Sequence, residues 1–172
     1  MSSTVTLARL EASYAPAIVA WLSDPAVGSN LGLRSKPTLE KTFAFIAACA
    51  TDDPLCARAI LLGGRHVGNV VLDHIDRHVG KARLHIYVGD AAARGHGVGQ
   101  RAVGLAVALA FDELALHKVW LTVHAKNAAA IRAYERAGFR VEGTHREEFL
   151  LDGVRIDELY MGVLKGEQTS AP

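Results

Sequence analysis

Cysteine is scarce in this chain, with two among 172 residues. Cys49 and Cys56 stand alone, which excludes a disulfide framework and a cysteine-rich metal site. Long apolar runs are also missing, since the run over 102–111 is far short of the roughly 20 residues that cross a bilayer. The first residues, Met1–Val5, lack the basic and apolar regions of a signal peptide. These absences favour a cytoplasmic protein with no membrane partner.

An excess of charge of either sign is missing as well. The chain has 19 lysines and arginines against 18 aspartates and glutamates, which argues against a nucleic-acid partner. Half of the residues are hydrophobic, enough for a core, and 172 residues fit one domain of about 100–200 residues. We therefore expect a single domain over residues 1–165 and a polar, disordered tail over 166–172.

Helical and strand-like segments alternate along the chain, which predicts a mixed α/β fold. The segment 82–88 is apolar on both faces, so we expect it in the centre of a sheet. Gly63-Gly64 and Asp152-Gly153 are typical of hairpin turns. Thr38 is suited to cap a helix. The expected strands cover 5–10, 57–62, 66–73, 82–88, 119–124, 144–151 and 154–164, and the expected helices cover 15–22, 38–50, 98–116 and 128–137.

What the chain does have is a run of alternating glycines, Arg94-Gly95-His96-Gly97-Val98-Gly99, between a strand and a long apolar helix. Glycine lets the backbone turn tightly, and a helix that begins at Val98 directs its free N–H groups at the turn. This geometry suits a phosphate group. The dinucleotide fingerprint fails because Gln100 stands where its third glycine is required, and a P-loop Gly-Lys-Ser/Thr is absent. A plain strand-to-helix turn without a ligand remains an alternative.

A second informative segment runs from Asn127 to Phe139. Asn127 is a good N-cap and Gly138 a good C-terminal residue for a helix. Asn127, Ile131 and Tyr134 share one face of that helix. Taken alone, this pattern also fits a structural helix whose tyrosine bonds a backbone group.

Together, the two segments resemble the GNAT superfamily of N-acetyltransferases. Arg94-x-x-Gly97-x-Gly99 is similar to its acetyl-CoA pyrophosphate motif, and Asn127 to Phe139 is similar to its second CoA motif. The segments 21–27 and 142–157 resemble the branch that includes ribosomal-protein alanine acetyltransferases. The resemblance implies a splayed, mostly antiparallel sheet of about seven strands flanked by helices.

The resemblance also implies acetyl-CoA as co-substrate and no metal. The pantetheine arm would add as a strand to the open edge of the sheet. Tyr134 matches the tyrosine near the CoA sulfur, where it would act as an acid or through a hydrogen bond, because a phenol has a higher pKa than a thiol. The residues implied to bind the cofactor are Val88, Gly89, Asp90, Arg94, Gly95, His96, Gly97, Val98, Gly99, Gln100 and Asn127.

At the position of the general base, this chain departs from the pattern of the family. Many members carry a glutamate where this chain has Arg83, which cannot act as a base. His85 lies two residues further on the same strand face and is our candidate, because imidazole titrates near neutral pH. A structural sheet histidine, a water chain and loss of the proton to bulk water remain alternatives. The other candidate bases are Glu147, Glu148 and Asp157.

The acceptor is expected to be a primary amine, either a protein N-terminus or a small amine such as an amino-sugar, a polyamine or an antibiotic. A polyamine needs clustered carboxylates, and those at 147, 148, 152, 157 and 158 fall mostly on a solvated hairpin, so we rank it lower. Trp21 and Phe43 are expected to line the acceptor cleft or the core. Asp73-His74-x-Asp76-x-His78 has metal-ligating residue types but fits a solvated turn better, and His117 and His124 are expected to be structural. A homodimer is a possible assembly, and a non-catalytic acyl-CoA-binding module is the alternative function.

Overall fold

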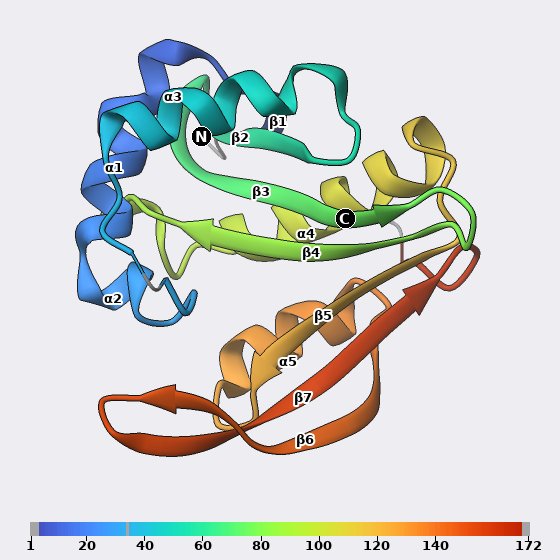
Figure 1. Cartoon of the computed structure of the whole chain (residues 1–172). Coiled ribbons are helices and arrows are strands. Elements are labelled where there is room, and N and C mark those ends of the chain that lie inside the picture. The colour runs from blue at the N-terminus through green and yellow to red at the C-terminus, as the bar shows by residue number, and fades with distance from the viewer. Residues whose placement is uncertain (1–3, 34, 170–172) are drawn as a thin grey trace.

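The computed structural model describes residues 4–33 and 35–169 and contains one sheet of seven strands (Figure 1). The strand order is β1-β2-β3-β4-β5-β7-β6, and every pair is antiparallel except β4 with β5. This confirms the predicted fold class and the central place of the fourth strand. The strands are β1 (Val5–Arg9), β2 (Cys56–Leu62), β3 (Arg65–Asp76), β4 (Lys81–Val88), β5 (Lys118–His124), β6 (Arg140–Leu151) and β7 (Val154–Leu164), and the helices are α1 (Ala15–Ser23), α2 (Pro25–Gly28), α3 (Leu39–Ala48), α4 (Val98–Ala108) and α5 (Ala128–Arg136).

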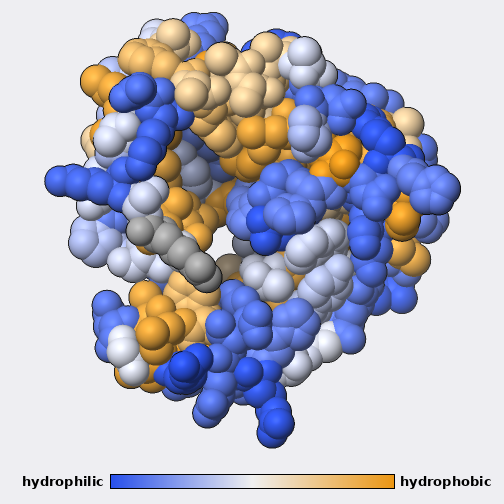
Figure 2. Space-filling model, in the orientation of Figure 1, coloured by the Kyte–Doolittle hydropathy of each residue, from blue (hydrophilic) through white to orange (hydrophobic). Residues whose placement is uncertain are grey.

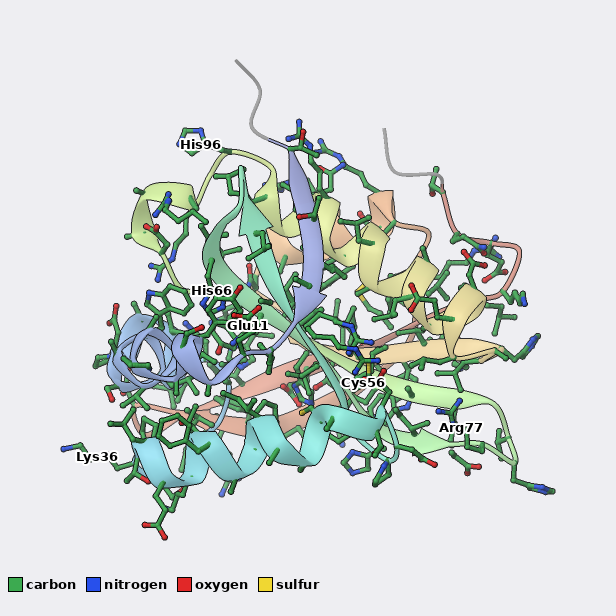
Figure 3. The ribbon with its side chains drawn as sticks, turned by 90° about the horizontal axis from the view of Figure 1, so that it is seen from above. Glu11, Lys36, Cys56, His66, Arg77 and His96 are labelled. Atoms are coloured by element: carbon green, nitrogen blue, oxygen red, sulfur yellow. The ribbon has the colours of Figure 1, made fainter. Side chains whose placement is uncertain are left out.

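Helices cover both faces of the sheet. Figures 1 and 3 show α1 and α3 on one face and α4 on the other. The small buried residues of α4, including Ala102 and Ala106, let this helix lie close to β1, β3 and β4. Strand β5 alternates between buried and half-buried residues, as a strand with one face on the core should.

The helix predicted over 98–116 changes form before its end. Regular α-helix stops at Ala108, and residues 109–113 form a wider π-helical turn. There the N–H of Leu114 donates to Leu109 O, and the N–H of Leu116 donates to Ala110 O. The apolar pattern located the segment, but it carries no signal for a turn that bonds five residues apart.

The sheet splits between its two central strands. Strands β4 and β5 pair through only three residue pairs, which end at Arg83 and Trp120. Beyond these residues the strands diverge, and Figure 1 shows the lower half of the sheet turning away from the upper half. The central split leaves one edge of β4 without a strand partner from Leu84 to Val88.

The ends of the chain differ in part from expectation. The predicted polar tail is ordered through Thr169, whose N–H donates to Ala137 O, while Arg140 and Glu167 form an ion pair at 3.2 Å. Residues 1–3 and 170–172 lie outside the described residues. The expectations of a start without a signal peptide and of a disordered end concern these residues in part. Both cysteines are free and buried. None of the helices described is long and apolar enough to cross a membrane.

Candidate functional site

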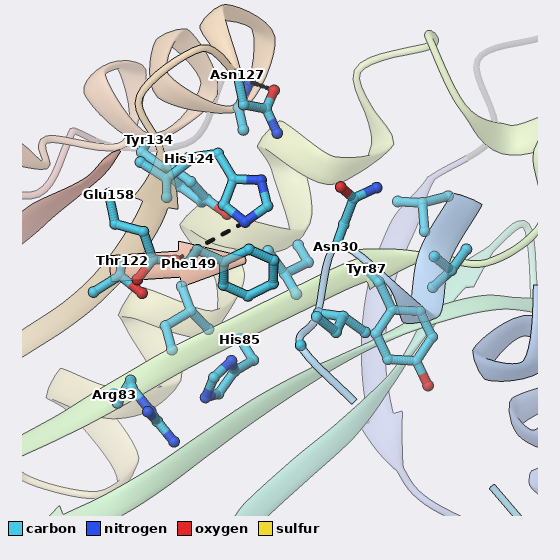
Figure 4. Close-up of a pocket in the computed structure, with 18 of the residues that line it drawn as sticks. Asn30, Arg83, His85, Tyr87, Thr122, His124, Asn127, Tyr134, Phe149 and Glu158 are labelled. Carbon is cyan, nitrogen blue, oxygen red and sulfur yellow. Dashed lines mark hydrogen bonds and ion pairs between the residues drawn. The ribbon is translucent and has the colours of Figure 1, made fainter. Parts of the chain in front are cut away.

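A cavity of about 450 Å³ lies in the split between β4 and β5 (Figure 4). The outer residues of β4 form one wall, and the ends of β5 and β7 with the start of α5 form the other. The loop after α2 closes it with Asn30 and Leu31. Because the open edge of β4 borders this cavity, an extended ligand with amide groups could bond to it as an added strand.

Val88, Gly89 and Asp90, which the resemblance implies in cofactor binding, lie at and beyond the end of the open edge of β4. Val88 lines the cavity, but the N–H groups of Gly89 and Asp90 both donate to Val67 O, at 2.9 and 3.0 Å. The Asp90 side chain caps the next turn and pairs with Arg65. The edge available for strand addition is therefore Leu84 to Val88.

The guanidinium of Arg94 is also engaged within the protein. Its Nε donates to Val88 O and its Nη2 donates to Gly89 O, both at 2.8 Å. These two bonds fix the end of β4, and Arg94 also lines the cavity. Its implied contact with the cofactor stays a prediction.

The glycine-rich loop forms the exposed N-terminus of α4, which begins at Val98 as predicted. Gly95 and Gly97 have positive φ angles of 78° and 74°, which only glycine adopts readily. The first bond of the helix runs from Arg101 N–H to Gly97 O, so the three preceding N–H groups have no partner within the helix. His96 projects outward at the tip of the loop (Figure 3). The first turn of the helix is formed by Val98, Gly99 and Gln100. The Nη1 of Arg136 donates a hydrogen bond to the Gln100 side chain at 2.9 Å.

Asn127 and Tyr134 both line the opposite wall of the cavity. The Oδ1 of Asn127 accepts a hydrogen bond from Ala130 N–H at 3.1 Å and so caps α5. This bond turns the amide nitrogen toward the cavity (Figure 4). Tyr134 packs against Phe139, and burial raises the pKa of its hydroxyl to about 12. The hydroxyl therefore keeps its proton at neutral pH.

A cluster around Asp73 carries the candidate base. The Oδ1 of Asp73 accepts from Arg83 Nε at 2.9 Å and lies 3.0 Å from His74 Nδ1, while its Oδ2 accepts from Arg83 Nη2 at 2.9 Å and lies 3.3 Å from His85 Nε2. Burial acts to raise the pKa of Asp73, but these donors outweigh it and hold the pKa below its usual range. The ionised carboxylate thus orients the ring of His85, and the ring's Nδ1 is left to accept a proton.

The cluster corrects the interpretation of the sequence from Asp73 to His78 as a solvated turn. Strand β3 continues to Asp76, so Asp73 is a strand residue that faces its partners on β4. Among the residues that the structure describes, no group of three metal-ligating side chains is found.

The sequence analysis missed a second pair, His124 with Glu158. Their side chains lie 4.0 Å apart, His124 at the end of β5 and Glu158 in the middle of β7, and line the cavity beside Phe149 (Figure 4). The sequence held only a weak signal, a histidine at a strand end. The alternative bases at 147, 148 and 157 are exposed on β6 and β7 and do not line this cavity.

A second cavity of about 390 Å³ lies over β3 and β4, beneath α1 and α3. Figure 2 shows the molecule hollowed between the half with α1 and α3 and the half with β6 and β7, with hydrophobic residues along the upper wall. The first helices do line this cleft, but through Ile18, Leu22 and Phe45 rather than through the expected pair. Trp21 packs on Gly89, and Phe43 is exposed.

Known proteins are similar to this chain in sequence and in fold. A family model described as "Acetyltransferase (GNAT) domain" matches residues 4–140. The chain is 35% identical over 100 residues to the probable N-acetyltransferase YjcK of Bacillus subtilis, a match that covers 58% of this chain and 55% of that protein. It is 34% identical over 90 residues to the spermidine N(1)-acetyltransferase of Escherichia coli, covering 52% of this chain and 48% of that protein. The matched regions thus span about half the length of these relatives.

A solved structure has nearly the same fold. The spermidine N-acetyltransferase from Vibrio cholerae in complex with CoA and spermine superposes with a TM-score of 0.88 at 23% identity. The superposition covers 95% of this chain and 96% of that one. The splayed sheet described above is therefore an arrangement that recurs in known proteins.

Proposed function

The chain belongs to the GNAT acetyltransferase family, and from this premise we propose that it transfers an acetyl group from acetyl-CoA to a primary amine. One observation carries the proposal. The cavity in the split and the cavity beneath α1 and α3 share the wall residues Leu31, Arg83, His85 and Tyr87. Two substrates that enter from different sides would meet beside His85. A protein that only binds acyl-CoA has no need of the second cavity.

The features of the first cavity fit acetyl-CoA. The open edge of β4 from Leu84 to Val88 offers backbone groups to the amides of the pantetheine arm. The free N–H groups at the start of α4 suit the pyrophosphate. The amide nitrogen of Asn127 can donate to a carbonyl oxygen of the arm. Acetyl-CoA supplies the acetyl group as an activated thioester.

Residues on both walls of the first cavity can take part in proton transfer. The amine must lose a proton to become a nucleophile, and the Nδ1 of His85 can accept it while Asp73 stabilises the resulting imidazolium. As the nitrogen–carbon bond forms, the carbon–sulfur bond breaks and the sulfur leaves as a thiolate. The hydroxyl of Tyr134 can donate a hydrogen bond to that thiolate, and a backbone N–H of β4 can donate to the carbonyl oxygen.

The acceptor could be a protein N-terminus or a small amine. Membership of the ribosomal-protein alanine acetyltransferase branch, a cytoplasmic location and a homodimer remain predictions. The spermidine acetyltransferases among the relatives support a small amine, although they match about half of their length.

Release of CoA thiol tests the proposal. The purified protein is mixed with acetyl-CoA and a panel of primary amines, and the free thiol and the acetylated amine are both measured. We expect amine-dependent release with an equal amount of acetylated product. Binding of acetyl-CoA without turnover of any amine would contradict the proposal and favour the acyl-CoA-binding module.

A further inference from the structure

The acceptor cavity carries information about the amine itself. Its described walls are mainly apolar and come from α1, the loop after α2, α3 and β3. They leave a largely apolar space against the face of β4 that carries His85, with the charged side chains of Lys41, Asp73 and Arg83 also in the lining. The residues that give it this character are Ile18, Leu22, Leu31, Leu33, Phe45 and Val71.

The amide of Asn69 and the hydroxyls of Tyr87 and Thr42 in this cavity already have hydrogen-bond partners. Asn69 donates to the hydroxyl of Tyr87 at 2.6 Å, and its Oδ1 lies 2.8 Å from His66 Nε2. The hydroxyl of Thr42 donates to Thr38 O at 2.8 Å. A buried polar side chain that is fully bonded gains little from a new ligand. The interior therefore offers few new hydrogen bonds to the acceptor.

The negative charge in this cavity is also already paired within the protein. Asp73 is the only carboxylate among the described residues that line this cavity. Both of its oxygens are occupied, by the two-pronged contact of Arg83 and by His74 and His85. Lys41, also a lining residue, adds a positive charge. A second or third ammonium group placed here would lie near cations and have no free carboxylate as a partner.

On the basis of the proposed function, we propose that the acceptor is a primary amine with a compact apolar substituent, rather than a polyamine. The substituent would occupy the apolar cavity, and the amine would lie at its junction with the first cavity. An apolar surrounding disfavours the charged form of an amine, so the same walls that bind the substituent help to produce the neutral nucleophile. Two sources share this chemistry, an apolar amino acid derivative and a protein N-terminus with an apolar first residue.

Steady-state rates for matched acceptors test the proposal. Leucinamide, a short peptide that begins with leucine, phenylethylamine and spermidine are compared by kcat/KM for thiol release. We expect at least one apolar amine to exceed spermidine by about tenfold or more, the scale of discrimination that an apolar pocket provides. The order of leucinamide and the peptide then distinguishes a small molecule from a protein N-terminus.

A variant pair provides the control. Leu33→Glu introduces a carboxylate into the cavity wall at a residue that is 45% exposed, and Leu39→Glu makes the same change on α3 at a residue that is 46% exposed and lines no part of the cavity. We expect Leu33→Glu to lower kcat/KM for the apolar amine by about tenfold and to raise it for spermidine, with Leu39→Glu unchanged. Acetyl-CoA binding, measured by calorimetry, reports that both variants are folded.

The outcomes separate the two proposals. Turnover of spermidine above all apolar amines, or an equal response of both variants, would overturn the inference about the acceptor and leave the acetyltransferase intact. Absence of turnover with every amine, despite acetyl-CoA binding, would overturn the proposed function and this inference with it.

Discussion

At the scale of single residues, the site depends on how one carboxylate is shared. Asp73 holds Arg83 and His85 on the neighbouring strand, so Arg83 has a defined structural task. Arg83 donates to both oxygens of the carboxylate, and His85 lies 3.3 Å from one of them. The residue types on β4 were visible in the sequence. Their partner on β3 was not, because the pairing of two strands is set by the fold.

His85→Gln tests the proposed base. Glutamine keeps a polar side chain near Asp73 but cannot accept a proton, so we expect kcat to fall roughly 10²-fold. The acidic limb of the wild-type pH–rate profile should also disappear, which a merely structural role would not cause. Calorimetry should show unchanged acetyl-CoA binding. A variant with wild-type kcat and the same pH profile would remove His85 from the mechanism.

Tyr134→Phe tests the donor to the leaving group. The ring remains packed on Phe139, while the hydroxyl that faces the cavity is lost. We expect turnover to fall by about tenfold or more and acetyl-CoA affinity to stay nearly the same. Stopped-flow measurement of thiol release with saturating acetyl-CoA checks this. Unchanged turnover would show that the hydroxyl has no part in the transfer.

At the scale of elements, we propose that the glycine-rich loop and the start of α4 form a phosphate cradle. Gly97 has a φ of 74°, and a Cβ added there would meet no described atom within 4 Å. The constraint at Gly97 in the free protein is thus the backbone angle and not a steric clash.

Gly97→Val should abolish acetyl-CoA binding, because a β-branched residue shifts the backbone away from this angle. Gly64→Val is the matched control, since Gly64 has a φ of 83° with open space around it in the turn between β2 and β3, away from the cavities. Both variants should lose comparable stability, and only the first should lose binding by calorimetry. Retained binding in Gly97→Val would contradict the cradle.

An ion-pair cluster joins three elements elsewhere in the fold. Asp52, after α3, accepts from Arg58 of β2 at 2.7 and 2.8 Å and from Arg9 of β1 at 2.9 Å. These contacts, led by the hydrogen bonds from Arg58, lower the pKa of Asp52 to about 2 from 3.8. The ionised form is therefore bound more favourably in the folded state than in the unfolded one.

This pKa shift predicts how stability depends on pH. The contribution of Asp52 is complete above about pH 4 and is lost as the pH falls toward 2. Asp52→Asn should lower the free energy of unfolding at neutral pH by about 1–3 kcal/mol and flatten its dependence between pH 4 and 2. Denaturant unfolding at several pH values measures this, with the exposed Asp112→Asn as control. An equal pH dependence in wild type and Asp52→Asn would contradict the assignment.

At the scale of the whole molecule, the sequence predicted more of the fold than of the site. The strand and helix positions, the central fourth strand and the meeting of Asn127 with Tyr134 followed from periodicity, caps and the resemblance. The pair of His124 and Glu158, the engagement of Arg94 with Val88 and the ordered segment to Thr169 did not. Each of these depends on groups brought together from distant parts of the chain, which local patterns do not encode.

The split sheet unites these observations. Three residue pairs hold the two halves together at one end, and the divergence beyond them creates the cavity that meets the apolar cleft at His85. The break in strand pairing thus places the first cavity beside the apolar cleft. We propose that an acetyl group passes from a donor in the first cavity to an acceptor in the second.

Simultaneous measurement of CoA thiol and acetylated amine tests that claim most directly. With acetyl-CoA and leucinamide or another amine of the panel, the account predicts that both products appear in equal amounts and that neither appears without the protein. Bound acetyl-CoA that yields neither product with any amine would contradict it.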